Sequence, residues 1–251
     1  MPRYKLTIEY DGTPFWGWQR QEDGPSVQGM LEEAAFAFCR QRVDVHGGGR
    51  TDAGVHALGQ VAHVDLPRDY QPGRIRDGFN ALLRPAPISI LSAEPVSDDF
   101  HARFSAIRRT YLYRLTDRRA PLTLDRDRVW RFRRALDVTL MQAGCEILIG
   151  RHDFTTFRDR DCQAPSPVKN LDHMEVARIG NEIQLRCHAR SFLHSQVRSM
   201  VGSLTELGVG RWDLAQFEAA LHARDRNRCG RVAPAKALYL VGIDYAPVDP
   251  L

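Results

Sequence analysis

Apolar residues recur along this chain at two spacings, and each spacing predicts one kind of element. Alternation of apolar and polar positions predicts strands, whereas apolar positions that return every three or four residues predict helices. We expect strands at 3–10, 43–46, 58–65, 88–92, 105–116, 171–179, 182–189 and 238–245. Helices are expected at 26–39, 74–83, 136–149, 192–208 and 213–223.

The order of these elements indicates a fold class. Strands arrive in pairs joined by short turns, such as Ile179-Gly180-Asn181, which favours an α+β fold over alternating βαβ units. No low-complexity linker interrupts the chain. We therefore expect two related α/β halves, 1–105 and 106–251, that share a long, mainly antiparallel mixed sheet with helices on one face and an active-site cleft between the halves.

Composition narrows the class of protein. Five scattered cysteines with no C-x-x-C pair argue against a disulfide framework or a structural zinc site. No segment approaches the run of about 20 apolar residues that a membrane span needs, and the first residues lead straight into a strand. The sequence thus predicts a cytoplasmic protein that does not associate with a membrane.

Charge adds a hint of a nucleic-acid partner. The net charge is only +4, but arginine outnumbers lysine and gathers in three clusters, at 108–114, 126–134 and 224–231. Guanidinium groups suit phosphate oxygens, and aromatic residues within the first two clusters offer surfaces for unpaired bases. The segment 125–128, in which aspartate and arginine alternate, is equally compatible with a solvated turn, so 108–114 is the stronger candidate for RNA contact.

A glycine-rich tract at 47–57 carries the most informative acidic residue. Asp52 lies there between glycines, with Arg50 two residues before it and His56 four after it. An Asp in such a turn usually caps backbone N–H groups, so the tract alone does not make Asp52 reactive. Glycine, however, permits a close approach of a ligand to the backbone, and loops carried between strands often hold reactive residues.

A resemblance that extends beyond this loop decides between the two interpretations. Gly49–His56 reads Gly-Arg-Thr-Asp-Ala-Gly-Val-His and resembles the signature of the tRNA pseudouridine synthase A (TruA) family. Further blocks are similar to that family in the same order, and together they span nearly the whole chain: 10–12, 17–21, 99–106, 109–113, 197–204 and 238–241. The loop block is the most specific of them.

The resemblance implies roles for three residues. Asp52 is the expected nucleophile, which either attacks ribose C1′ or assists loss of a proton from C2′. Arg198, at the edge of the apolar stripe of the helix 192–208, is expected to keep that carboxylate ionised, although a snorkelling surface arginine would fit the pattern as well. Tyr111 is expected to stack on a flipped uracil and to handle the proton at C5, although an ordinary core position is the plain alternative.

Other residues receive supporting roles. Arg50, Arg20, Arg109 and Leu238 are expected to bind the substrate, Leu238 at the floor of the pocket. His56 could resemble a metal ligand, but no third ligand is suitably spaced, so a hydrogen bond that stabilises the loop is favoured and no metal is expected. Ala237 stands where the family usually carries glycine, and it restricts φ beside the pocket.

As a whole, the resemblance implies an isomerase that converts uridine to pseudouridine at nucleotides 38, 39 and 40 of the tRNA anticodon stem-loop, without a cofactor, as a homodimer. Two other classes of protein fit the sequence less well. A noncatalytic RNA-binding module has no use for the Asp52 carboxylate. A metal-dependent or glycosidic hydrolase would need a ligand cluster or a second carboxylate near Asp52, and the sequence shows neither.

Overall fold

The computed structural model describes residues 1–246, which form two compact units. The N-terminal unit comprises residues 1–109 together with the last strand, and the C-terminal unit comprises residues 110–238. The boundary at 109/110 lies four residues beyond the expected one. The position of the last strand departs further from expectation, because we expected this strand in the C-terminal half and it lies in the N-terminal unit.

Four strands of the N-terminal unit lie in the order β4-β1-β3-β11, and a short β2 pairs with β3. Their bounds are β1 Arg3–Tyr10, β2 Val45–Gly47, β3 His56–Asp65, β4 Ile88–Val96 and β11 Leu238–Tyr245. β1 pairs with β3 and β4 in antiparallel fashion, whereas β11 is parallel to β3 through Tyr239 and Leu240. This pairing explains why the last strand belongs to the N-terminal unit.

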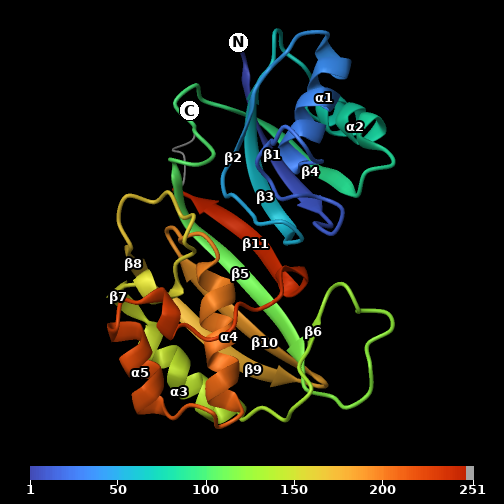
Figure 1. Cartoon of the computed structure of the whole chain (residues 1–251). Helices are drawn as coiled ribbons and strands as arrows, with labels where there is room; N and C mark the ends of the chain where they lie inside the picture. Colours follow the sequence, from blue (N-terminus) through green and yellow to red (C-terminus); the bar gives the residue numbers. More distant parts are fainter. Residues whose placement is uncertain (247–251) are drawn as a thin grey trace. The chain divides into compact units, whose positions relative to one another are not determined.

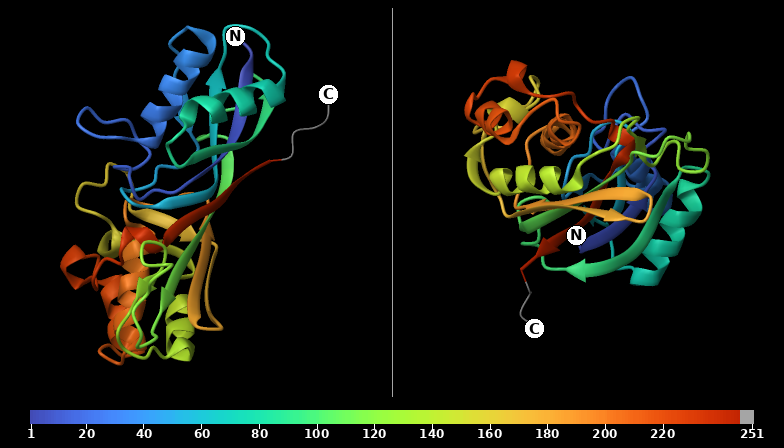
Figure 2. Two further views of the ribbon diagram at one scale, coloured as in Figure 1. Left: turned by 90° about the vertical axis from the view of Figure 1, so that its right-hand side faces the viewer. Right: turned by 90° about the horizontal axis from the view of Figure 1, so that it is seen from below.

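Both helices of this unit cover the same side of its sheet (Figures 1 and 2). They are α1, Val27–Cys39, and α2, Pro72–Leu83. In β1 every second residue is buried, namely Tyr4, Leu6, Ile8 and Tyr10, as the alternating pattern predicts. Ser26 caps the start of α1, since its side chain accepts a hydrogen bond from the Gly29 N–H, and the helix buries Val27, Leu31, Ala34 and Ala35.

The C-terminal unit contains the strand order β5-β10-β9, with β6 parallel to β5 and a separate antiparallel pair of β7 and β8. The bounds are β5 Ala106–Thr116, β6 Trp130–Arg131, β7 Gly150–Asp153, β8 Val168–Leu171, β9 His173–Ile179 and β10 Glu182–Ala189. The chain passes from one unit to the other within β5. The helices of the C-terminal unit are α3 Val138–Leu148, α4 Gln196–Gly208 and α5 Leu214–His222. The unit also contains three short 3₁₀ turns, namely η1 Thr155–Phe157, η2 Arg226–Arg228 and η3 Ala235–Ala237.

The α+β class is confirmed, and most expected elements lie within two or three residues of their predicted bounds. Strand β4 extends to Val96, four residues beyond its expected end at 92, and one helix also differs by four residues. We expected it to begin at 192, but α4 begins at Gln196 because Ser195 has a left-handed backbone (φ 56°), which interrupts the helical conformation. The pair β7 and β8 was not expected, since its strands are too short to show alternation. The cleft between the halves stays a prediction.

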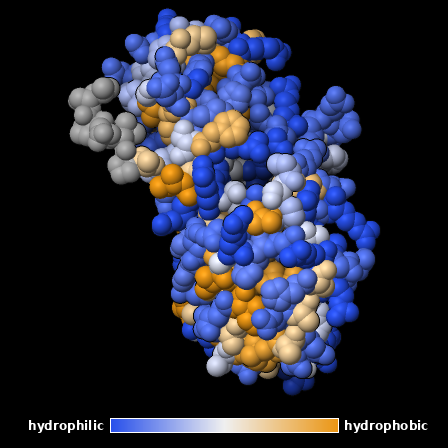
Figure 3. Space-filling view, turned by 90° about the vertical axis from the view of Figure 1, so that its left-hand side faces the viewer, coloured by the Kyte–Doolittle hydropathy of each residue, from blue (hydrophilic) through white to orange (hydrophobic). Residues whose placement is uncertain are grey.

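No helix among residues 1–246 is long and apolar enough to cross a membrane. On the face shown in Figure 3, hydrophilic residues predominate, and the hydrophobic residues gather in a broad area in the lower part of the view and in smaller areas above it.

Candidate active site

Asp52 lies on the loop that joins β2 to β3, and buried polar groups hold this loop from several sides. Gln60, which is fully buried on β3, accepts a hydrogen bond from the Gly49 N–H (3.2 Å) and donates to the Gly49 carbonyl (2.7 Å). Next to Asp52, the hydroxyls of Thr51 and Tyr10 are 2.8 Å apart. Complete burial raises the pKa of Tyr10 to about 12, so this phenol stays neutral in the core. Asp52 itself is half-buried.

The loop that carries Asp52 depends on two close approaches that only glycine permits. Gly17 has φ +104°, and a Cβ there would lie 2.7 Å from the Thr51 carbonyl oxygen. A Cβ on Gly12 would lie 2.0 Å from the carbonyl oxygen of Val55. The segment 10–18 is therefore in direct backbone contact with the loop that carries Asp52.

His56 closes the loop at its C-terminal end. Its Nδ1 accepts a hydrogen bond from the Gly12 N–H (3.1 Å) and lies 3.2 Å from a carboxylate oxygen of Asp11. The ring stacks on Tyr239 with centroids 4.8 Å apart. The expected loop-stabilising hydrogen bond is thus confirmed. Among residues 1–246 no group of three or more His, Cys, Asp or Glu side chains is arranged to hold a metal ion.

The arginines expected to bind substrate in this unit differ in their surroundings. Arg50 is exposed beside Asp52. Arg20 is also exposed, and its guanidinium pairs with Glu32 at 3.0 Å. Arg109 is buried and donates to the carbonyl of Gly48 through Nε (3.1 Å) and Nη2 (2.6 Å). These bonds give Arg109 a part in holding the start of the loop, and its RNA contact stays a prediction.

Tyr111 and Tyr113 lie on β5 in the C-terminal unit, and both are buried. The ring of Tyr111 meets Phe192 edge to face, with centroids 5.2 Å apart. The hydroxyl of Tyr113 donates to the Pro234 carbonyl at 2.9 Å, and burial raises its pKa well above the ordinary value. The structure thus ties Tyr113 to the 230–234 segment, which the sequence did not reveal.

Arg198 stands out within α4, because every other residue of this helix is buried whereas Arg198 is partly exposed. The Nε of Arg198 donates to the Ala233 carbonyl (2.8 Å), and the Ala233 N–H donates back to the carbonyl of Arg198 (3.0 Å). We refer to residues 230–234, which run along α4, as the strap. A Cβ on Gly202 would lie 1.7 Å from the Arg231 carbonyl oxygen, so the strap lies directly on the helix backbone.

The helix was expected to bury a single apolar stripe. Leu193, Val197, Met200, Val201 and Leu204 are buried as predicted. Polar residues on its other sides are buried as well, because the strap and neighbouring segments cover them. Gly230, for example, donates its N–H to the Ser203 hydroxyl at 3.0 Å.

The remaining sequence candidates have clear positions. Leu238 is buried at the start of β11, directly after the 3₁₀ turn that contains Ala237. Ala237 is not among the residues with positive φ, so alanine fits the backbone there without strain. The segment 125–128 forms a turn in which the Arg128 and Val129 N–H groups donate to the Asp125 carbonyl, and Arg126 pairs with Asp127 at 3.3 Å. These contacts support the interpretation of 125–128 as a solvated turn rather than as an RNA contact.

Comparison with known proteins bears on what these residues do. The family model described as tRNA pseudouridine synthase matches residues 6–105 and 145–246. The chain belongs to the tRNA pseudouridine synthase family. It is 61% identical over 98% of its length to the tRNA pseudouridine synthase A of Maricaulis maris, 98% of which is covered. The protein of the same name from Afipia carboxidovorans is 60% identical, with 98% of this chain and 100% of that relative covered.

A solved structure titled "Crystal Structure of a Cbf5-Nop10-Gar1 Complex" is similar over 81% of this chain and 45% of that chain, with a TM-score of 0.37 and 12% identity. The family assignment rests on the sequence relatives.

Proposed function

We propose that this protein isomerises uridine to pseudouridine at nucleotides 38, 39 and 40 of the tRNA anticodon stem-loop, with Asp52 as the nucleophile. Membership of the tRNA pseudouridine synthase family makes the protein an isomerase that acts on tRNA. The observation that carries the finer proposal is the position of Asp52 on a loop whose backbone is held by buried side chains. A nucleophile needs this kind of preorganisation.

The reaction is balanced without a metal or a redox cofactor. The bond from ribose C1′ to N1 of uracil breaks, a bond from C1′ to C5 forms, and the proton on C5 moves to N1 by way of the site or solvent. A carboxylate can hold one fragment while the ring turns, as at the anomeric carbon in retaining glycosidases. Asp52 either attacks C1′ and holds the ribose as an ester until C5 displaces it, or acts as a base that removes the C2′ proton to give a glycal and returns that proton when C5 bonds to C1′.

Arg198 and Tyr111 complete the proposed set of catalytic residues. The guanidinium of Arg198 is held through Nε by the Ala233 carbonyl, and in this proposal its positive charge keeps the Asp52 carboxylate ionised. Tyr111 supplies a flat surface for the flipped base and a hydroxyl for proton transfer at C5. Arg50 fills the space that the flipped nucleotide leaves, and Arg20, Arg109 and Leu238 contact the substrate around it. The proposal requires both units to act on one nucleotide.

The setting of the reaction follows from the same proposal. The protein works in the cytoplasm as a homodimer, and each tRNA spans both subunits. Action at three adjacent nucleotides favours recognition of tRNA shape and backbone over base sequence.

Replacement of Asp52 by Asn tests the proposal. The variant keeps the shape of the side chain but removes the nucleophile, so we expect pseudouridine formation to fall by about 10³-fold or more while tRNA affinity stays near the wild-type value. Asp44→Asn, the same change at an exposed position of the same unit, serves as the control and should leave the rate unchanged. Mapping of pseudouridine in treated tRNA gives the readout. An Asp52→Asn variant with a tenth of the wild-type rate would exclude a nucleophilic role.

A further inference from the structure

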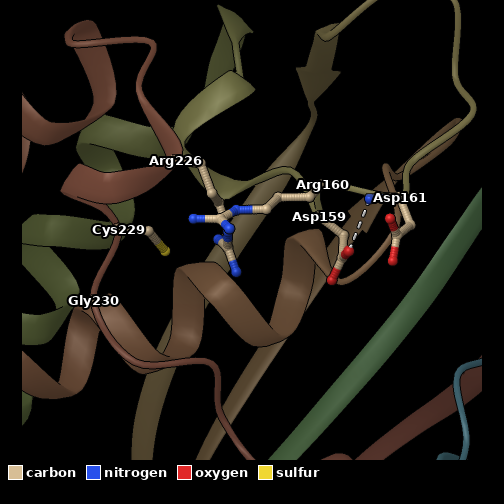
Figure 4. Close-up of a pocket in the computed structure, with 6 residues that line it drawn as sticks. All are labelled: Asp159, Arg160, Asp161, Arg226, Cys229 and Gly230. Carbon is tan, nitrogen blue, oxygen red and sulfur yellow. Dashed lines mark hydrogen bonds between the residues drawn. The ribbon is translucent and has the colours of Figure 1, made fainter.

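A polar pocket of the C-terminal unit, shown in Figure 4, is balanced in charge by its own lining. Its cavity has a volume of about 430 Å³, and the charged residues that line it are two arginines and two aspartates, namely Arg160, Arg226, Asp159 and Asp161. Burial alone would raise the pKa of Asp159, but the Asp161 N–H, which donates at 3.1 Å, and the charge of Arg226 lower it. The charges of this pocket therefore interact with one another and favour no charged ligand.

The N-terminal unit has a more informative feature, an aromatic side chain that faces solvent beside the loop of Asp52. Trp16 is 52% exposed, whereas the nearby aromatic residues Phe15 and Trp18 are 5% and 2% exposed. Trp18 belongs to the core, and its ring centroid lies 6.2 Å from that of Tyr10. Single apolar residues are common on protein surfaces, so exposure alone does not assign a function to Trp16.

The position of Trp16 is the first observation that points to a function. The carbonyl of Phe15 accepts a hydrogen bond from the Gly54 N–H at 3.3 Å. A Cβ on Gly17, the residue after Trp16, would lie 3.3 Å from the carbonyl carbon of Asp52. Both neighbours of Trp16 in the chain thus contact the reactive loop, and consecutive Cα atoms are only about 3.8 Å apart. Whatever lies on Trp16 lies next to the group that reacts at Asp52.

The indole ring of Trp16 has one face covered by the chain itself. A Cβ on Gly24 would lie 2.3 Å from Cδ2 and 2.8 Å from Cε2 of Trp16, the two carbons at which the indole rings are fused. These carbons can be approached only from a face of the ring system, because ring bonds surround them in its plane. Gly24 therefore backs one face, and exposure of half the residue leaves the other face to solvent.

The backbone of Trp16 is also fixed. Its N–H donates to the Pro25 carbonyl (2.8 Å), and its carbonyl accepts a hydrogen bond from Nε2 of Gln21 (2.8 Å). A large, rigid aromatic side chain loses little conformational entropy when a ligand packs on it. An indole with one face backed and the other open therefore provides a surface on which a planar ligand stacks.

The charges near Trp16 favour a base over a phosphate as that ligand. The loop behind the ring carries Glu22 and Asp23, both exposed, and the exposed Arg20 of the same loop pairs with Glu32 at 3.0 Å. Two acidic side chains disfavour a phosphate at this loop, whereas stacking on a neutral indole needs no charge.

We propose that the open face of Trp16 stacks on an unpaired base of the bound tRNA, next to the uridine that reacts at Asp52. The inference rests on the proposed function, since it places Trp16 on the same substrate. Every base has a flat π surface, so the contact holds the strand without reading its sequence, as action at three adjacent nucleotides requires. Trp16 positions the RNA and takes no part in the chemistry.

Three substitutions of Trp16 test the contact in binding to an anticodon stem-loop RNA. We expect Trp16→Ala to bind about tenfold more weakly, with the slope of log Kd against log salt unchanged because no charge is lost. Trp16→Tyr keeps a flat ring and should stay within about threefold of the wild type. Trp16→Leu keeps apolar bulk without a flat surface and should lose as much as Trp16→Ala. Wild-type affinity in Trp16→Leu would show that the ring does not stack.

Phe36→Ala is the matched control for these variants. Phe36 is an exposed aromatic residue of α1 in the same unit, but its ring is already covered by the guanidinium of Arg42, 5.3 Å from the ring centroid. We expect its removal to leave RNA affinity unchanged. A loss equal to that of Trp16→Ala would contradict a contact specific to Trp16.

Abasic nucleotides, introduced one at a time into the stem-loop, identify the stacked base. Loss of that base should weaken binding to the wild type about tenfold but leave binding to Trp16→Ala unchanged, because this variant has already lost the contact. A purely structural role for Trp16 would not produce this coupling. If the wild type and Trp16→Ala responded alike at every nucleotide, no base would lie on Trp16 and the proposal would be wrong.

The outcomes also separate this inference from the proposed function. If the Trp16 variants bound tRNA like the wild type and still formed pseudouridine, the stacking contact would be wrong and the function would stand. If the abasic scan placed a base on Trp16 but no pseudouridine formed, the function would fail and the contact would stand. If Trp16→Ala changed the oligomeric state in sedimentation at unchanged tRNA affinity, the ring would contact protein and the proposal would be contradicted.

Discussion

Asp52 and Arg198, the two charged residues of the proposed mechanism, are positioned by different means. Asp52 lies on a loop, and side chains from other segments hold the backbone of that loop: Gln60 and Arg109 bind its glycine carbonyls, and His56 binds Gly12 beside it. Arg198 lies on α4, whose own hydrogen bonds fix its backbone. The strap meets this helix through backbone groups, with Ala233 bonded to Arg198 in both directions.

The difference shows where each unit is sensitive to substitution. A loop without regular hydrogen bonds needs polar side chains for its peptide groups, so loss of one side chain leaves buried peptide groups without partners. A helix needs no such support, but a segment that lies on its backbone leaves no room for a side chain. The loop that carries Asp52 should therefore be sensitive at the buried polar residues that hold it, besides Gly12 and Gly17, whereas α4 should be sensitive at the glycine on which the strap lies.

The largest effect is expected for Gly202→Ala. The added Cβ would lie 1.7 Å from the Arg231 carbonyl oxygen, so the strap must move and the two bonds between Ala233 and Arg198 would be strained or lost. We expect the free energy of unfolding to fall by about 3 kcal/mol or more in chemical denaturation. Gly73→Ala in α2 is the control, since nothing lies within 4 Å of its added Cβ. A loss below about 1 kcal/mol for Gly202→Ala would show that the strap does not depend on close contact.

Acid should destabilise the N-terminal unit through a buried histidine on β3. Burial and the neighbouring His46 lower the pKa of His63 to about 4, and its Nδ1 accepts a hydrogen bond from the Ala102 N–H at 3.1 Å. The unfolded chain, with a pKa of about 6.5 at this residue, binds the proton first as the pH falls. The stabilisation is therefore complete above pH 6.5 and is lost as the pH falls towards 4, by up to about 3 kcal/mol.

His63→Gln isolates this contribution, because glutamine can accept a hydrogen bond but does not titrate. We expect its free energy of unfolding to fall less than that of the wild type between pH 7 and pH 4, as measured by urea denaturation at each pH. Parallel curves for the two proteins would show that other groups carry the acid sensitivity.

A smaller effect is expected for Gln60→Leu, which tests the support of the catalytic loop. The substitution keeps the approximate volume but leaves the N–H and the carbonyl of Gly49 without the Gln60 side chain. We expect a loss of about 2 kcal/mol in stability and a lower rate of pseudouridine formation, since the loop would no longer be fixed. Gln41→Leu, at an exposed position, is the control. If Gln60→Leu kept the wild-type rate, the loop would not need this amide for catalysis.

Local pattern alone sufficed for many elements. Periodicity predicted β1, β10 and α1 nearly to the residue, from alternation in 3–10 and 182–189 and from helical spacing in 26–39. An element that buries one face places apolar residues at the period of that element, so the pattern can be recognised in the sequence. The glycine-rich tract around Asp52 was also recognisable, since the need for glycine at close backbone contacts leaves a clear trace in the sequence.

Tertiary structure determined which strands pair and which distant side chains contact each element. The partner of β11 is β3, some 180 residues earlier in the chain, and apolar alternation gives the buried face of a strand but not its neighbour. Nothing in the sequence around Gln60 indicates that its side chain bonds to Gly49. The pocket lined by Arg160 and Arg226 forms only because two segments far apart in the sequence fold together. The sequence thus determined the elements and the reactive loop, whereas long-range packing determined which polar groups find partners, because those partners come from segments with no local signal.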